Sequence, residues 1–288
     1  MRRLYISLHT NLTGLHRLIR AAFTPQVPRG RALVWGYIKI WWAEKFQKRR
    51  TRPLNVLGFT LHFASLYYLK HLYRELFVEH LYYFPHEGGR PRIIDAGANI
   101  GDSLLYYKYL YPEAEVVCFE PDPLNFSILE KNIAANNLQN VSAHQVAVAA
   151  EAGSVDMYYD PEAAGDTGQS ASREFRAALD DAKLAKHNVK AVSLETYLKE
   201  HVDVLKIDVE GTEGELIAAI EPQLKNVGLL QLEFHYFKDN HLQPILDTLE
   251  RSGFQWRIYA PLDLQSNNGS TAMIYASPET ARVQRLFV

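Results

Sequence analysis

The 288-residue chain has little cysteine and no long apolar run, and each shortage narrows the classes of protein to which it can belong. Its single cysteine, Cys118, excludes a disulfide within the chain and a zinc site built from several thiolates. No stretch of about 18 consecutive apolar residues occurs, so the sequence predicts no transmembrane helix. The first residues also lack the apolar core and cleavage site of a secretory signal. We therefore expect a cytoplasmic protein.

Charge is distributed unevenly, although the net charge is only -2. Residues 1–52 carry twelve Lys or Arg and one acidic residue, Glu44, whereas the rest of the chain carries 19 basic and 32 acidic residues. Apolar residues between positions 4 and 22 recur at helical spacing, which predicts a basic amphipathic helix. This arm favours peripheral contact with the inner face of a membrane or with a protein partner. A helix packed on its own domain is the alternative. No nucleic-acid motif accompanies the arm, so we expect no nucleic-acid partner.

The rest of the chain predicts two further segments. Residues 53–90 contain an alternating strand pattern with a turn at Gly58, followed by a helix over 65–84. A main domain follows at 91–288, in which strands alternate with helices, and this alternation predicts a doubly wound, mostly parallel α/β sheet. The expected strands lie at 92–96, 115–120, 141–146, 203–208, 229–234, 254–259 and 272–276, and the expected helices near 101–111, 123–137, 212–221 and 240–252.

Two places depart from this alternation. The last two strands are separated by a loop without a helical pattern, so we expect them to pair as an antiparallel hairpin at the sheet edge. Between residues 153 and 193 the pattern predicts a strand at 153–159, a loop, and a helix over 172–186. This insertion is either a lid over a substrate or a surface addition.

A turn with two glycines connects the first strand of the main domain to its helix, in the sequence DAGANIGDS. Glycine permits a sharp turn and a close approach of backbone to a ligand, and a helix N-terminus binds an anionic group. The spacing is not that of a dinucleotide site, because Asn99 and Asp102 stand where that motif has glycine. We interpret the turn as a site for S-adenosylmethionine (SAM). The predicted contacts are Asp95, Gly97, Asn99, Gly101, Asp102 and Ser103.

An acidic residue ends the second strand, about twenty residues beyond the glycine turn. A carboxylate in this place accepts hydrogen bonds from ribose hydroxyls, so Glu120 and the adjoining Pro121 join the predicted cofactor site. Asp122 suits the cap of the next helix, and Pro123 suits its first position.

The ends of two later strands supply the candidate catalytic groups. Asp208 follows the fourth strand, in the sequence VLKIDVEGTEGEL, and strand C-termini face the ligand in this class of sheet. Asp208 and Glu210 could orient SAM, hold a metal or act as a general base. Glu233 and His235 share one side of the next strand. His235 is the first choice of base because an ordinary histidine pKa is nearest to neutral pH. We predict no metal site. In an alternative mechanism, Asp208 and Glu233 would hold a divalent ion.

These blocks, together with VVCFEPDPLNFSILEKNIAANN, SLETYL and QLEFH, occur in an order that resembles the FkbM family of SAM-dependent methyltransferases, over roughly residues 91–260. The resemblance implies the class I methyltransferase fold and methyl transfer to a hydroxyl of a sugar, glycan or secondary metabolite. It assigns Asp95, Gly97, Asn99, Gly101 and Glu120 to SAM. The arm at 1–52 has no counterpart in the family.

We therefore predict a SAM-dependent O-methyltransferase with a small-molecule or glycan acceptor and an N-terminal helical extension. One alternative keeps the fold and changes the chemistry to a nicotinamide-dependent oxidoreductase. The other is a non-catalytic, membrane- or partner-associated protein that uses the basic arm. The sequence identifies neither the acceptor nor the oligomeric state.

Overall fold

The computed structural model describes residues 30–46, 52–159, 170–173, 184–237, 240–259 and 271–279. The helix predicted for residues 1–24 lies outside this range. The chain divides into two compact units after Tyr83, whereas the sequence placed the start of the main domain near Pro91. None of the helices in the described part of the chain is both long enough and apolar enough to cross a membrane.

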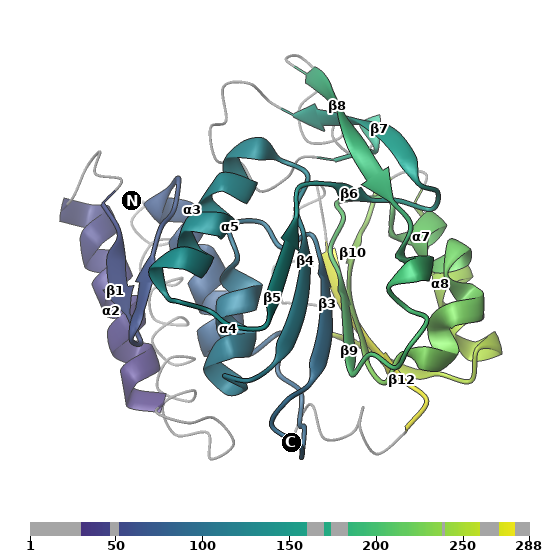
Figure 1. The fold of residues 1–288 in the computed structure, drawn as a ribbon, viewed down its shortest axis with the longest axis horizontal. Coiled ribbons are helices and arrows are strands. Elements are labelled where there is room, and N and C mark those ends of the chain that lie inside the picture. Colours follow the sequence, from purple (N-terminus) through teal and green to yellow (C-terminus); the bar gives the residue numbers. More distant parts are fainter. Residues whose placement is uncertain are drawn as a thin grey trace, which may run out of the picture. The chain divides into compact units, whose positions relative to one another are not determined.

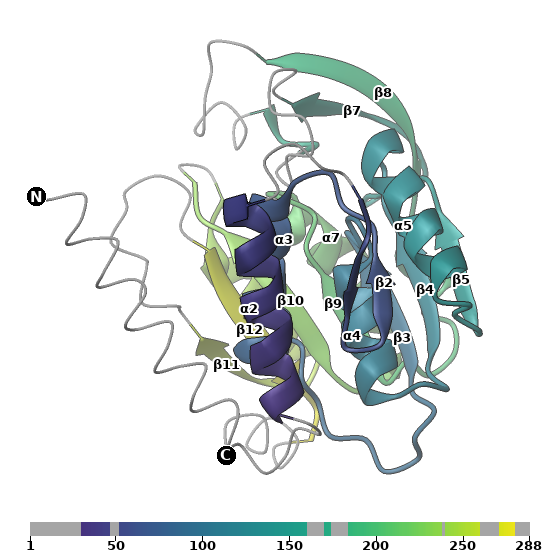
Figure 2. The same ribbon diagram turned by 90° about the vertical axis from the view of Figure 1, so that its left-hand side faces the viewer.

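The first unit consists of helices and one hairpin (Figure 2). The predicted strand is a two-stranded hairpin, because Leu57 and Gly58 both adopt positive φ (57° and 90°), the conformation of a tight turn. The predicted helix over 65–84 is too long, since regular helix ends at Tyr73 and a π-helical turn ends at Val78. The elements of the first unit are α2 (Gly30–Phe46), β1 (Leu54–Val56), β2 (Phe59–Leu61), α3 (Leu66–Tyr73) and η1 (Arg74–Val78).

A seven-stranded sheet forms the centre of the second unit, in the order β11-β12-β10-β9-β3-β4-β5. The strands from β10 to β5 run parallel, and β12 pairs antiparallel with both β10 and β11. The predicted antiparallel edge hairpin is therefore confirmed. The strands are β3 (Arg92–Ala96), β4 (Glu115–Phe119), β5 (Val141–His144), β9 (Val204–Ile207), β10 (Leu230–His235), β11 (Gln255–Tyr259) and β12 (Thr271–Ser277).

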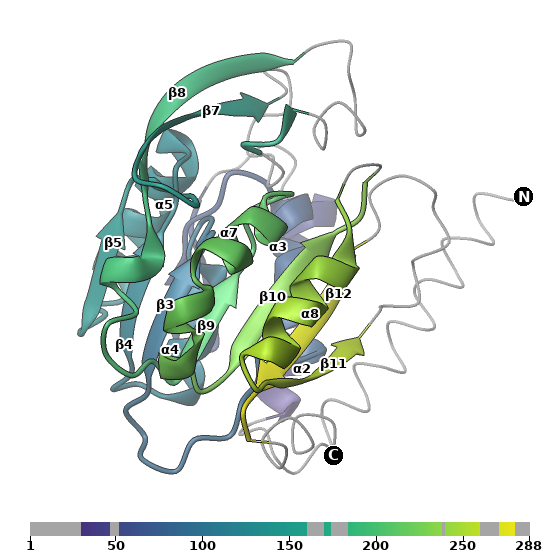
Figure 3. The ribbon, with the colours of Figure 1, turned by 90° about the vertical axis from the view of Figure 1, so that its right-hand side faces the viewer.

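Helices cover both faces of this sheet (Figures 1 and 3). From β3 the chain adds strands toward β5, and from β9 it adds strands in the opposite direction, so right-handed connections place α4 and α5 on one face and α7 and α8 on the other. The direction reverses between β9 and β3, and ligands of such sheets bind outside the strand C-termini at that point. The helices are α4 (Asp102–Leu110), α5 (Pro123–Ala135), α7 (Glu213–Ala219) and α8 (Leu242–Arg251), with short 3-10 helices η3 (Leu194–Thr196) and η4 (Glu221–Asn226).

The strands next to the reversal point are buried on both sides. All four residues of β9, VLKI, are buried, and so are the last four of β3. Aliphatic side chains of β9, β10, α7 and α8 form the large apolar cluster of this unit. Continuous apolar runs are typical of parallel strands that are covered on both faces. The exception in β9 is Lys206, a buried charge that needs a partner.

A second, three-stranded sheet in the order β6-β8-β7 lies beyond the C-terminal ends of the central strands (Figure 1). The predicted strand at 153–159 is confirmed as β7. The helix predicted over 172–186 is wrong at its end, where Ala185 and Lys186 pair with Tyr159 and Tyr158, and the residues 174–183 lie outside the described range. The strands are β6 (Ala147–Val148), β7 (Gly153–Tyr159) and β8 (Ala185–Val192).

Candidate active site

The glycine turn after β3 is shaped by contact with β9. Gly97 adopts φ +85°, and a Cβ atom there would lie 1.8 Å from the carbonyl oxygen of Asp208. Gly101 adopts φ +87°, and a Cβ atom there would lie 2.6 Å from a methyl carbon of Leu129. Asn99 also adopts positive φ, 49°, which asparagine tolerates better than most residues. Both glycines are thus required by the packing of the protein itself, a reason that the sequence prediction did not include.

Beneath this turn, Asp95 is fully buried and belongs to an ion pair that the sequence did not predict. Ser103 donates a hydrogen bond to its Oδ2 atom (2.5 Å), and Lys206 Nζ lies 3.2 Å from its Oδ1 atom. Lys206 also lies 3.5 Å from Asp208 Oδ2 and donates to the carbonyl of Gly97. Burial by itself would lower the pKa of Lys206, but the carboxylates of Asp95 and Asp208 outweigh it and raise that pKa. Asp95 and Ser103 therefore help to fix the conformation of the glycine turn.

Glu120 follows β4 and faces the same turn. Its Oε2 atom accepts the N–H of Asn99 (2.8 Å), and its Oε1 atom accepts the N–H of Asp122 (2.9 Å). Burial raises the pKa of Glu120 to about 8, although these two N–H groups act to lower it. Each oxygen retains capacity for a further donor. Asp122 caps α5 through its Oδ1 atom, as the sequence predicted, and the half-buried Pro121 separates the two acids.

Asp102 begins α4 at the far end of the turn. Its Oδ1 atom is buried and has no hydrogen-bond partner among the described residues. Burial raises the pKa of this carboxyl group to about 7. A buried polar atom without a partner is uncommon and costly, so this position is a candidate for a ligand contact.

The second group of predicted residues meets at the C-terminal ends of β9 and β10. His235 Nδ1 lies 2.8 Å from Glu213 Oε1, and its Nε2 atom lies 3.2 Å from Glu210 Oε2 and 3.9 Å from Asp208 Oδ1. Burial by itself would lower the pKa of His235, but Glu210 and Glu213 outweigh it and raise that pKa well above its ordinary value. The expectation of an ordinary histidine pKa is therefore wrong.

Glu213 is the partner that the sequence analysis missed. It begins α7, is fully buried and pairs with His235. Its Oε1 atom also accepts the N–H of Gly211 (2.7 Å), and its Oε2 atom accepts from Asn240 Nδ2 (3.3 Å). The nearby Glu210 adopts φ +57°, a conformation that costs energy for a residue other than glycine.

Glu233 precedes His235 by two residues in β10, so both side chains lie on the same side of the strand, as predicted. Burial and the nearby charge of Asp208 raise the pKa of Glu233 to about 7, against the effects of His235, Lys206 and a hydrogen bond with Thr271. This carboxyl group consequently changes its charge close to neutral pH.

Three side chains lie close enough together to hold a metal ion, but they are not the predicted pair of Asp208 and Glu233. The structure groups Asp208 with Glu210 and His235, with one donor atom of each within 4.8 Å of the others. Glu233 is not in this group. Within the same cluster, His235 Nε2 pairs with Glu210 Oε2.

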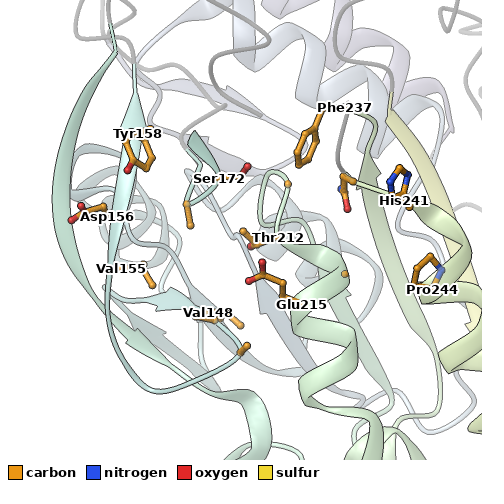
Figure 4. A pocket seen from close by; sticks show the side chains of 16 residues that line it. Val148, Val155, Asp156, Tyr158, Ser172, Thr212, Glu215, Phe237, His241 and Pro244 are labelled. Atoms are coloured by element: carbon orange, nitrogen blue, oxygen red, sulfur yellow. The ribbon is translucent and has the colours of Figure 1, made fainter. Parts of the chain in front are cut away.

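A cavity of about 800 Å³ (Figure 4) is lined in part by Gly211 and Asn240, which both donate hydrogen bonds to Glu213. Val155, Asp156 and Tyr158 of β7 line one side, while Thr212 and Glu215 at the start of α7 line another. The remaining wall includes Phe237, Asn240 and His241, between β10 and α8. Among the residues that the structure describes, no Lys or Arg and none of the predicted site residues line this cavity. Asn240 connects the two regions, because its side chain donates to Glu213 and to the carbonyl of His235.

Comparison with known proteins shows the family to which the chain belongs. The family model described as "Methyltransferase FkbM domain" matches residues 95–256. The methyltransferase sdnD of Sordaria araneosa is 30% identical over 178 residues, which cover 53% of this chain and 69% of that protein. The 31-O-demethyl-FK506 methyltransferase FkbM of Streptomyces tacrolimicus is 29% identical (54% of this chain, 72% of that protein).

The 2-O-methyltransferase NoeI of Sinorhizobium fredii is 25% identical over 175 residues, which cover 55% of this chain and 71% of that protein. The matched region contains the glycine turn, Glu120 and the His235 cluster, on a class I methyltransferase sheet. The chain belongs to the FkbM methyltransferase family.

Proposed function

We propose that the protein uses SAM to methylate a hydroxyl oxygen of an uncharged acceptor. The observation that carries this proposal is that two groups of residues lie close together at one edge of the sheet. One group is the glycine turn with Glu120, and the other is the cluster of Asp208, Glu210 and His235. They are joined by Lys206, which contacts both Asp95 and Asp208. A cofactor on the first group would therefore face ionisable side chains of the second.

The residues around the turn fit SAM. Glu120 is buried, has spare acceptor capacity and follows β4, the position in which a carboxylate binds ribose hydroxyls. The unpartnered Oδ1 atom of Asp102 provides another acceptor. The N-terminus of α4, after the left-handed Gly101, presents backbone N–H groups suited to a carboxylate. Glu120, Asp102 and the turn would hold the cofactor, while Asp95 and Ser103 would keep the turn in place.

SAM supplies a methyl group that is already activated by the positive sulfonium. The chain itself must then hold the acceptor oxygen in line and take up its proton. Glu233 suits this second role, because its pKa of about 7 lets it accept a proton near neutral pH. His235, paired with Glu210 and Glu213, is a positive group that would favour binding of the deprotonated oxygen. We therefore assign general base catalysis to Glu233 and replace His235 in that role.

The cavity of about 800 Å³ is the proposed acceptor site. Its wall combines apolar side chains with the rings of Tyr158 and Phe237 and the carboxyl group of Glu215. The carboxylate of Asp156, also in this wall, is already bound by Lys186 and Asn188. Carboxylates accept hydrogen bonds from hydroxyl groups, and the described part of the wall contains no Lys or Arg, which disfavours a phosphorylated or carboxylated acceptor. Two relatives, a 31-O-demethyl-FK506 methyltransferase and a 2-O-methyltransferase, support oxygen as the methylated atom.

The test combines a binding measurement with product identification. Calorimetric titration of the full chain should give saturable binding of SAM and none of NAD. Incubation with methyl-labelled SAM and a metabolite extract should then yield a labelled product, in which mass spectrometry locates the methyl group. Binding of NAD instead of SAM would overturn the cofactor assignment, while a label on nitrogen or carbon would overturn only the oxygen assignment. The family membership and the turn spacing both count against the oxidoreductase alternative.

A further inference from the structure

Helix α2 of the first unit has one face that is fixed by packing. Leu33 and Ile40 are completely buried, and Ala43 is nearly so. The hydroxyl group of Tyr73 in α3 donates a hydrogen bond to the carbonyl of Leu33 (2.9 Å). A Cβ atom at Gly36 would lie 2.1 Å from that hydroxyl oxygen. The close approach of α3 therefore determines which side of α2 faces inward.

The side chains on other positions of α2 form an exposed aromatic stripe, which we define as Trp35, Trp42 and Phe46. Their exposed fractions are 71%, 54% and 67%. Spacings of seven and four residues place them along one side of a helix. The rings of Trp42 and Phe46 are stacked with centroids 4.6 Å apart. Single exposed apolar residues are ordinary, but three large exposed rings on one side of a helix indicate an interaction surface.

The segment that contains the stripe is basic in its sequence. Residues 1–52 contain twelve Lys or Arg, and their only acidic residue, Glu44, pairs with Lys70 of α3 at 2.7 Å. Glu44 is thus neutralised within the unit, so it adds little negative potential to this side. Tryptophan beside basic residues is the composition of segments at membrane–water interfaces, where the rings enter the headgroup region and the cations pair with anionic lipids.

We propose that α2 binds an anionic lipid surface, with Trp35, Trp42 and Phe46 inserted at the interface. The aromatic stripe supplies apolar burial and the basic residues supply the attraction, and stable peripheral binding generally requires both. The proposal is independent of the methyl-transfer proposal, because it uses none of the residues of the second unit.

The test uses the full chain with vesicles of phosphatidylcholine alone and with added phosphatidylglycerol. We expect sedimentation with the anionic vesicles, a tryptophan emission shifted to shorter wavelength, and quenching by brominated acyl chains. The triple variant Trp35→Ala/Trp42→Ala/Phe46→Ala should bind about tenfold more weakly or worse. The matched control Leu124→Ala/Ile258→Ala/Tyr259→Ala removes three exposed apolar side chains of the second unit and should bind like the parent.

Three results would overturn the proposal. The first is equal sedimentation with neutral and anionic vesicles. The second is undiminished binding of the triple variant, which would leave charge alone as the cause. The third is concentration-dependent self-association without lipid that the triple variant abolishes, since a second copy would then cover the stripe. Quenching by brominated lipid is measured on the parent chain, so it decides the matter even if the triple variant folds poorly.

Discussion

The two halves of the candidate site satisfy their polar groups in different ways. Around the turn after β3, Glu120 accepts backbone N–H groups from Asn99 in the turn and from Asp122, two residues further along the chain. At the ends of β9 and β10, side chains pair with side chains, as in the contact of His235 with Glu213. In the first half, backbone N–H groups hold Glu120, the candidate ribose acceptor. In the second half, paired side-chain charges shift one another's pKa. This contrast suits a half that holds a cofactor beside a half that moves a proton.

The largest expected effect is a loss of stability when Lys206, which contacts both halves of the site, loses its charge. The substitution Lys206→Met removes the buried cation between Asp95 and Asp208. It should lower the free energy of unfolding by about 3–5 kcal/mol, because an unpaired buried carboxylate is left behind. Urea denaturation measures this effect. The control Lys190→Met, on the exposed side of β8, should change stability by less than about 0.5 kcal/mol. Equal effects of the two substitutions would show that the link is not structural.

The second prediction concerns the proton-moving half. Glu233→Gln keeps the size and acceptor oxygen of the side chain but cannot take up a proton. It should lower kcat about 10²- to 10³-fold with little change in SAM affinity. In the parent, kcat should rise as pH increases through about 7, where Glu233 loses its proton, and the variant should lack this rise. Initial rates against pH measure both effects, with Glu250→Gln on the surface of α8 as the control. A variant with parental kcat would remove Glu233 from the mechanism.

The third prediction concerns the cofactor half. Glu120→Ala removes both carboxylate oxygens at the end of β4 and should weaken SAM binding about tenfold or more, or ~1.4 kcal/mol. Calorimetry measures the dissociation constant. Glu115→Gln provides the control, since Glu115 is exposed at the opposite end of the same strand, where it pairs with Arg90. Equal affinity of the Glu120 variant and the parent would invalidate the placement of the ribose.

The smallest effect is a pH dependence of SAM affinity. Because burial raises the pKa of Glu120 to about 8, the free chain carries a proton there at neutral pH. Ribose hydroxyl groups donate best to the carboxylate, so binding should release that proton and weaken as pH falls through 8. We expect affinity to increase about three- to tenfold from pH 6.5 to 8.5. Asp102 titrates near 7 in the same region, so Glu120→Gln and Asp102→Asn are compared separately. A pH-independent parent would contradict the proposal.

The sequence predicted the strands and helices of the main sheet closely, since their patterns are local. The strand expected at 92–96 is β3, and the helix expected near 123–137 is α5, which begins at Pro123 after the cap Asp122. The prediction was wrong at Ala185 and Lys186. Both are good helix formers, yet they lie in β8 because pairing with β7 overrides the local preference.

Within the site, the sequence identified residues in motifs and missed those whose role depends on a distant partner. Glu120 was found because its distance from the glycine turn is characteristic. Glu213 was missed because its partner, His235, lies 22 residues away on another element. A signal for Lys206 was available, since a lysine flanked by apolar residues in a buried strand needs a counter-charge. Nothing comparable indicated Asn240.

The sequence alone thus determined the class of sheet, the position of the glycine turn and the acid that follows the second strand, because each depends on short-range patterns. Only the tertiary structure decided which charges meet. It brought Glu213 and Glu210 to the two nitrogens of His235 and left Glu233 to titrate near neutrality. The reason is that a pKa depends on burial and on charges within a few ångströms, and those distances arise only when β9, β10 and α7 pack together.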